Sequence, residues 1–178
     1  LWILNEAYFC LSGTVNKQNM RFWGLENPHV VHEQPFYDAK LLVWCAMSEH
    51  GIISPYFFDG TVNLERYREM LNTFFFPVLK ALRIPLAIDW FQQDGDTAHC
   101  SNENLELLES KFGDRLISRR TQRTLPPRSP DLSTCDFYLW GYLKSKVYAN
   151  GPSNLQVLRR NIEQEIRGIS RETRQKVM

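Results

Sequence analysis

The chain has 178 residues, a formal net charge of +1, and a hydrophobic content of 43%. This length and composition suit one globular domain with a sizeable core and exclude a disordered chain. No apolar run approaches the ~18 residues that a membrane-spanning helix needs, and the first residues do not form a signal peptide. We therefore expect an intracellular protein with no membrane partner.

Charge is divided unevenly along the chain. Residues 1–110 hold 7 Lys/Arg against 14 Asp/Glu, whereas residues 111–178 hold 14 Lys/Arg against 6 Asp/Glu. Such a basic half favours an anionic partner, although ordinary solvated helix faces explain the same charges equally well. The candidate nucleic-acid-binding residues in this half are Arg119, Arg120, Arg123 and Arg128.

The first part of the chain is dominated by strand patterns. WILNEAYFCL (2–11) predicts a strand, and residues 12–35 predict a long loop. The segments 39–48 and 52–60 predict two further strands that form a hairpin around EHG. Apolar residues at helical spacing then predict a helix over 63–83, with a kink at Pro77.

The second part alternates strands and helices. LAIDWFQQD (86–94) and RLISR (115–119) predict strands, and SNENLELLESKF (101–112) predicts a helix that begins near Ser101 and ends at Gly113. A helix is expected from about Ser133 to Tyr148, and another begins with a capping box of Ser153 and Gln156. An antiparallel three-strand meander followed by parallel strands, flanked by helices, is the ribonuclease H-like order. We expect one domain over residues 1–178, cut short at both ends.

Two aspartates follow separate elements of this predicted sheet. Asp94 ends a strand and Asp136 falls in the first turn of a helix. Each has an ordinary explanation, as a turn residue or as a charge that stabilises a helix N-terminus. Two carboxylates that converge on one edge of a sheet would also suit a divalent metal ion.

The sequence resembles the catalytic domain of mariner-type transposases, in the Tc/mariner superfamily of DDE/D enzymes, and among these the insect mariner-like elements. The residues that carry the resemblance are VNKQNMRFWGLENPHV, GIISPYFFDGTVNLERYREML, FQQDGDTAH and PPRSPDLSTCDFYLWGYLKSKVY. It implies a nuclear protein that cleaves and transfers DNA strands with two Mg²⁺ or Mn²⁺ ions. Asp94 and Asp136 correspond to the second and third catalytic carboxylates, which are also the metal ligands.

The first catalytic position differs from the family pattern, because Asn5 stands where the resemblance places the metal-bridging aspartate. A neutral amide removes a full negative charge from that place. Glu6 is expected not to replace it, because successive strand side chains point to opposite faces. We therefore predict a transposase-derived domain that is catalytically inactive, with at most one bound metal ion.

Several other residues take roles from the resemblance or from packing. His99 could orient water or phosphate, as a nucleic-acid-binding residue, or could form a hydrogen bond at the entry to a helix. Asp131 is expected to shape the loop and to lie outside the carboxylate cluster. Three aromatic residues have spacings that favour the core over base stacking; they are Trp140, Tyr142 and Tyr148.

The expected partners are DNA, bound without sequence preference, and a second subunit contacted through residues 12–35. We expect no small-molecule substrate, and the helix-turn-helix region that reads transposon ends is expected to be missing. A non-enzymatic module that binds nucleic acid or protein is the alternative function. A third possibility is an active nuclease with an altered metal site.

Overall fold

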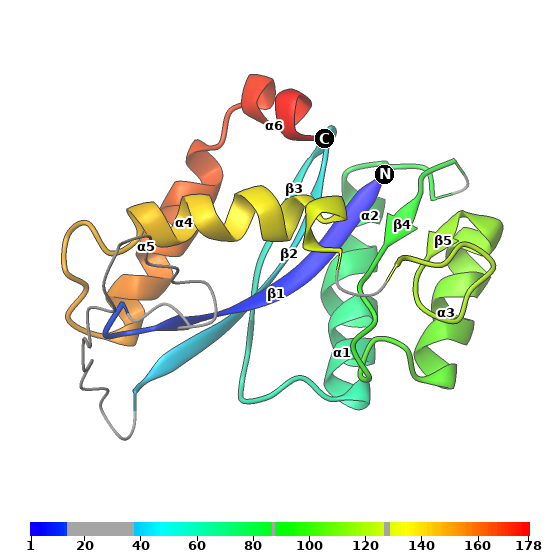
Figure 1. Cartoon of the computed structure of the whole chain (residues 1–178), viewed down its shortest axis with the longest axis horizontal. Helices are drawn as coiled ribbons and strands as arrows, with labels where there is room; N and C mark the ends of the chain where they lie inside the picture. Colours follow the sequence, from blue (N-terminus) through cyan, green and yellow to red (C-terminus); the bar gives the residue numbers. More distant parts are fainter. Residues whose placement is uncertain (14–37, 87, 127–128) are drawn as a thin grey trace, which may run out of the picture.

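The computed structural model describes residues 1–13, 38–86, 88–126 and 129–178, and these form a five-stranded mixed sheet in the order β3-β2-β1-β4-β5 (Figure 1). β1 (Trp2–Cys10), β2 (Lys40–Ser48) and β3 (Gly51–Phe58) pair antiparallel. β4 (Phe91–Gln92) pairs parallel with β1, and β5 (Leu116–Ile117) pairs parallel with β4. This is the predicted arrangement of a meander followed by parallel strands.

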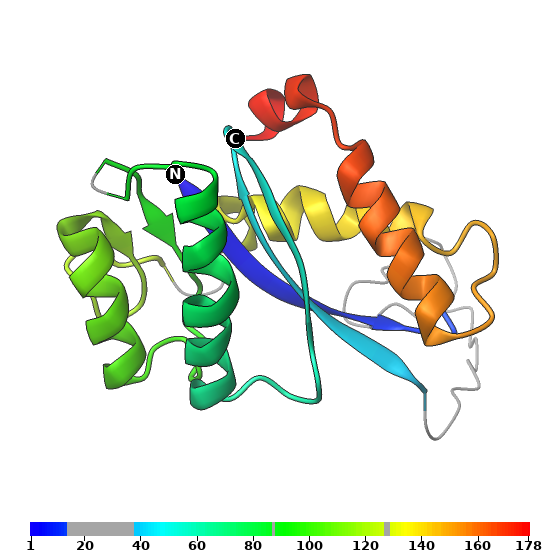
Figure 2. The same cartoon turned by 180° about the vertical axis from the view of Figure 1, so that it is seen from behind.

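Helices cover both faces of the sheet (Figures 1 and 2). One group contains α1 (Leu64–Met70), α2 (Phe76–Ala81) and α3 (Asn102–Phe112). The other contains α4 (Trp140–Lys146) and α5 (Leu155–Gly168), and the short α6 (Arg171–Val177) follows at the C-terminal end. None of the helices in the described residues is long and apolar enough to cross a membrane.

Alternating strand residues divide the core into two clusters. Trp44 and Ala46 of β2 belong to the cluster that packs against α1, α2 and α3. Val43, Cys45 and Met47 of the same strand belong to the cluster that packs against α4 and α5. A period of two is the pattern of a strand buried on both faces. The second cluster also contains the three aromatic residues predicted for the core, with Trp140 buried and Tyr142 and Tyr148 partly buried.

A π-helical segment, η2 (Leu71–Phe75), joins α1 to α2 where the sequence predicts a kink at Pro77. Proline has no backbone N–H, so it cannot donate to the carbonyl one turn earlier. The helix widens before Pro77, where the Phe76 N–H donates to the Leu71 carbonyl five residues earlier. A second π-helical segment, η5 (Cys135–Leu139), carries Asp136 and continues into α4.

The helix ends follow the sequence signals, with one correction. The Ser101 side chain accepts from the Asn104 N–H to cap α3, which ends at Gly113 with a φ of 58°. In contrast, α5 is not capped by Ser153 as predicted, because the Asn154 side chain accepts from the Val157 N–H. The helix therefore starts one residue later than the capping-box pattern indicates.

Two other predictions concern the sheet and the loop. The strand predicted over 86–94 is only Phe91–Gln92, because β4 pairs with its two neighbours at those two residues alone. The predicted loop over 12–35, with its subunit contact, lies outside the described residues apart from Ser12 and Gly13.

Candidate functional site

A cleft of about 710 Å³ opens where β1 and β4 separate. The two strands pair at Trp2–Phe91 and Ile3–Gln92, and β1 then continues along β2 to Cys10. The cleft is lined by residues from β1, from the loop after β4, and from the segment that leads into η5. These include Asn5, Glu6, Asp94, Asp96, Arg119, Ser133 and Asp136.

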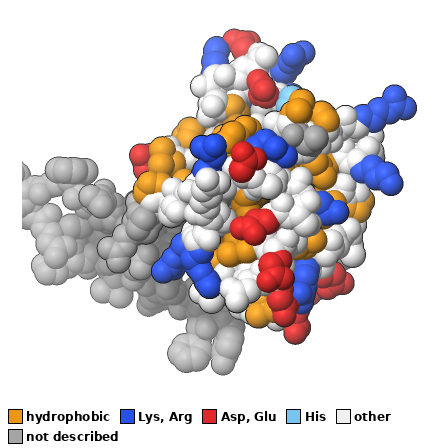
Figure 3. Space-filling view, turned by 90° about the vertical axis from the view of Figure 1, so that its right-hand side faces the viewer, with side chains coloured by type: hydrophobic (Ala, Val, Ile, Leu, Met, Phe, Trp, Pro, Cys, Tyr) orange, Lys and Arg blue, Asp and Glu red, His pale blue; other side chains and the backbone are white. Residues whose placement is uncertain are grey.

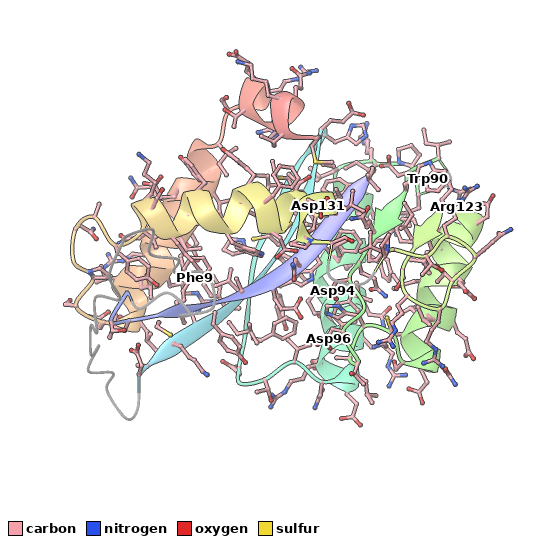
Figure 4. All side chains as sticks on the ribbon, in the orientation of Figure 1. Phe9, Trp90, Asp94, Asp96, Arg123 and Asp131 are labelled. Atoms are coloured by element: carbon pink, nitrogen blue, oxygen red, sulfur yellow. The ribbon has the colours of Figure 1, made fainter. Side chains whose placement is uncertain are left out.

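The structure thus brings together the three positions that the sequence singles out, namely Asn5, Asp94 and Asp136. Asp131 lies in η4 (Pro130–Leu132) and is not among the described residues that line the cleft. Figure 4 shows Asp94 on the loop after β4 and Asp131 on the segment before α4. The catalytic roles of Asn5, Asp94 and Asp136, and the metal-binding roles of the two aspartates, remain predictions.

His99 lies beneath the cleft between two carboxylates, and its side chain is only 2% exposed. Its Nδ1 is 2.6 Å from Oδ1 of Asp94, and its Nε2 is 3.0 Å from Oε1 of Glu6. Carboxylate oxygens only accept hydrogen bonds, so Nδ1 donates to Asp94, while Nε2 lies within ion-pair distance of Glu6 but outside hydrogen-bond geometry. Two adjacent carboxylates favour the charged imidazolium.

The electrostatics of the pair agree with this geometry. Burial alone would lower the pKa of His99, but the charge of Glu6 and the contacts with Asp94 and Glu6 raise it to about 10. Burial alone would raise the pKa of Asp94, but the hydrogen bond and charge of His99, with the Asp96 N–H, lower it below its usual range. Asp94 and His99 each favour the charged form of the other.

Buried neighbours fix the orientation of this imidazole. The ring of Tyr67 lies over it, with the two centroids 4.2 Å apart. The Tyr67 hydroxyl donates to Oε1 of Gln93 at 2.6 Å, and Nε2 of Gln93 donates to the His99 carbonyl at 3.1 Å. These contacts fix the imidazole of His99 within the fold, and its predicted role toward water or phosphate stays a prediction.

Asn5 is buried, and its amide oxygen accepts a hydrogen bond from the backbone. Oδ1 accepts from the Glu6 N–H at 2.7 Å. Burial raises the pKa of Asp136, which also lines the cleft, above its usual range. The charges of Asp94 and Glu6 add to this rise. Contacts from Ser133 and Asn5 act in the opposite direction.

Strand alternation predicts that Glu6 points away from Asn5, yet both residues line the cleft. That Glu6 does not replace the bridging aspartate stays a prediction. Beyond Ile3, β1 has no partner among the described residues on its β4 side. The open edge lets the longer Glu6 side chain reach His99. Two features of the sequence could have indicated the contact between Glu6 and His99. They are the carboxylate of Glu6 directly after Asn5 and a histidine five residues after Asp94.

The predicted basic residues divide by their contacts. Arg120 donates to the Cys100 carbonyl and to Oδ1 of Asn102. Arg123 donates to the Asp114 carbonyl, and its guanidinium lies 4.9 Å from the centre of the Trp90 ring, away from Asp94 (Figure 4).

Of the remaining two, Arg119 lines the cleft, and Arg128 lies outside the described residues. On the face drawn in Figure 3, basic side chains are interspersed with acidic ones.

The donor set does not fit a two-metal centre. The position that the resemblance assigns to the bridging carboxylate holds a neutral amide, Asn5, whose oxygen accepts from the backbone. Oδ1 of Asp94 accepts from both His99 and the Asp96 N–H. Within the described ranges, no group of three or more His, Cys, Asp or Glu residues has an arrangement that could hold a metal ion. Two hard cations at one site need several free, negatively charged oxygens.

Comparison with known proteins gives structural matches alone. No protein-family model matches the chain, and no curated protein matches it. The Mos1 transposase paired-end complex with left transposon end superposes with a TM-score of 0.72 and 17% identity, over 99% of this chain and 50% of that chain. A pre-cleavage Mos1 transpososome gives a TM-score of 0.73 at 14% identity, over 99% and 51%.

The isolated catalytic domain of Mos1 mariner transposase also matches, with a TM-score of 0.65 and 15% identity, over 78% of this chain and 67% of that chain. The chain therefore spans about half the length of the Mos1 chains in the DNA complexes. These matches confirm the predicted ribonuclease H-like fold.

Proposed function

We propose that this chain is a transposase-derived domain that binds the phosphate backbone of DNA and does not cleave the DNA. The chain has the fold of a mariner transposase catalytic domain. The observation that carries the proposal is the composition of the cleft. It retains Asp94 and Asp136 but has Asn5 at the position that the resemblance assigns to the bridging carboxylate.

The absence of cleavage follows from the charge and the contacts at Asn5. Strand cleavage by this class of site needs one metal ion for the attacking oxygen and one for the leaving oxygen. The Mos1 structures include complexes with Mn and with Mg. Four acidic residues line the cleft in this chain, but Glu6 and Asp94 are paired with His99 and Asn5 adds no charge, so we infer at most one weakly held ion.

DNA binding is supported by two observations. The neighbours that match over 99% of the chain include the Mos1 transposase paired-end complex with left transposon end and the Mos1 strand transfer complex. The excess of Lys/Arg lies in residues 111–178. Contacts to phosphates carry no sequence information. We therefore infer weak binding without sequence preference, and a nuclear location that follows from a DNA partner.

The test has two arms on the purified chain. The first is incubation with a labelled DNA hairpin in Mg²⁺ and in Mn²⁺, where we expect no strand cleavage; cleavage would show an active nuclease with an altered metal site. The second is fluorescence anisotropy with a labelled duplex between about 50 and 200 mM salt, where affinity should fall steeply. If no binding appears at the lowest salt, the protein-binding alternative replaces this proposal.

A further inference from the structure

Arg119 is a cationic side chain at the cleft whose charge is not paired among the described residues. Arg119 is exposed and lines the cleft together with four acidic residues. None of the carboxylates in the described residues forms an ion pair with it. The other nearby cation, His99, is buried and occupied by two carboxylates. Among the described residues that line the cleft, Arg119 is therefore the cation that is available to a ligand.

The position of Arg119 depends on the residue that follows Asp94. A Cβ atom at Gly95 would lie 3.1 Å from Cδ of Arg119 and 3.5 Å from its Cβ. The aliphatic stem of the arginine thus crosses the backbone at Gly95, in space that any larger residue would occupy. A side chain at Gly95 would have to displace this stem by a few tenths of an ångström, so the lack of a Cβ favours the close approach.

The following residue fixes the turn that directs Arg119 to the cleft. Arg120 has a φ of 69°, in the left-handed region that non-glycine residues adopt at a cost. Its guanidinium bonds to the Cys100 carbonyl at 3.1 Å and to Oδ1 of Asn102 at 3.0 Å. These two bonds tie the turn to the start of α3, so the adjacent arginines serve different purposes.

A guanidinium with free N–H groups is suited to a phosphate, because its planar donors match two phosphate oxygens. We propose that Arg119 contacts a backbone phosphate of DNA at the mouth of the cleft, and that Gly95 and Arg120 position it there. The proposal rests on the DNA binding proposed above and assigns that binding to one residue. Arg120 and Arg123 then act within the fold.

The test compares DNA affinity across a matched set of variants by fluorescence anisotropy. Arg119→Ala should weaken binding about tenfold and reduce the slope of log affinity against log salt by about one. Arg123→Ala removes the same charge from a side chain held over Trp90, and it should weaken binding by less than about twofold. Arg119→Lys should recover part of the affinity, because a point charge still attracts phosphate.

Gly95→Ala tests the positioning directly, since it keeps every charge while displacing the Arg119 stem. We expect a measurable loss of affinity that is smaller than that of Arg119→Ala, because the stem is displaced by only a few tenths of an ångström, with an unchanged thermal unfolding midpoint. Equal losses for Arg119→Ala and Arg123→Ala, or full affinity in Gly95→Ala, would overturn the assignment. If the unaltered chain does not bind DNA at all, the proposed function itself has failed.

Discussion

The Nδ1 atom of His99 lies 2.6 Å from Oδ1 of Asp94, so a buried imidazolium holds the carboxylate that the sequence marks as a metal ligand. Because Glu6 lies at the other ring nitrogen, removal of the imidazole would leave two carboxylates without their common cation. We expect His99→Gln to lower the free energy of unfolding by about 2–4 kcal/mol, measured by urea denaturation.

A control and a double variant separate this effect from general damage. His50→Gln alters a histidine whose side chain is 46% exposed, and it should cost much less. Adding Glu6→Gln to His99→Gln removes one of the two unpaired carboxylates, so the double variant should lose less than the sum of the two single losses. A strictly additive double variant would show that Glu6 and His99 do not interact.

The same contact predicts how stability depends on pH. The pKa of His99 is raised to about 10 in the folded protein, against an ordinary value of 6.5. The folded state therefore binds this proton more tightly than the unfolded state, and the stabilisation is fully present below pH 6.5. It should be lost progressively as the pH rises from 6.5 towards 10, with a slope of at most about 1.4 kcal/mol per pH unit.

Urea titrations at several pH values within that window measure the slope, and His99→Gln provides the reference. The variant should lack this part of the pH dependence. Identical slopes for the two proteins would mean that His99 does not bind an extra proton in the folded state.

The cap of α5 gives a local test of the fold. Asn154 accepts from the Val157 N–H at 3.0 Å, whereas the sequence pattern assigns the cap to Ser153. Asn154→Ala should lower the free energy of unfolding by about 1 kcal/mol, and Ser153→Ala should cost only a few tenths. The reverse order, measured by thermal or urea denaturation, would restore the capping-box interpretation.

Much of the architecture could be predicted because it depends on local patterns. The strand periods, the EHG turn and the Ser101 cap together indicate a meander followed by parallel strands. The length of β4 could not be predicted, since it depends on where Phe91 and Gln92 meet their neighbours and not on their own composition.

The sequence indicates which carboxylates belong to the candidate site, but it does not indicate which residues they contact. The resemblance indicates Asp94, Asp136 and the exceptional Asn5, and the structure places all three around one cleft. The role of Glu6 depends on an open strand edge, which strand alternation alone does not reveal. Counting arginines likewise cannot show that Arg120 and Arg123 are held by the fold while Arg119 faces the cleft.

Calorimetric titration with Mn²⁺ shows whether Asn5 prevents a two-metal centre. We predict that the unaltered chain binds at most one ion weakly, whereas Asn5→Asp binds Mn²⁺ more tightly and in greater number, because the bridging charge is restored. Asn72→Asp adds the same charge at an exposed position on η2, and it should leave Mn²⁺ binding unchanged. Equal affinity and stoichiometry for the unaltered chain and Asn5→Asp would contradict the account.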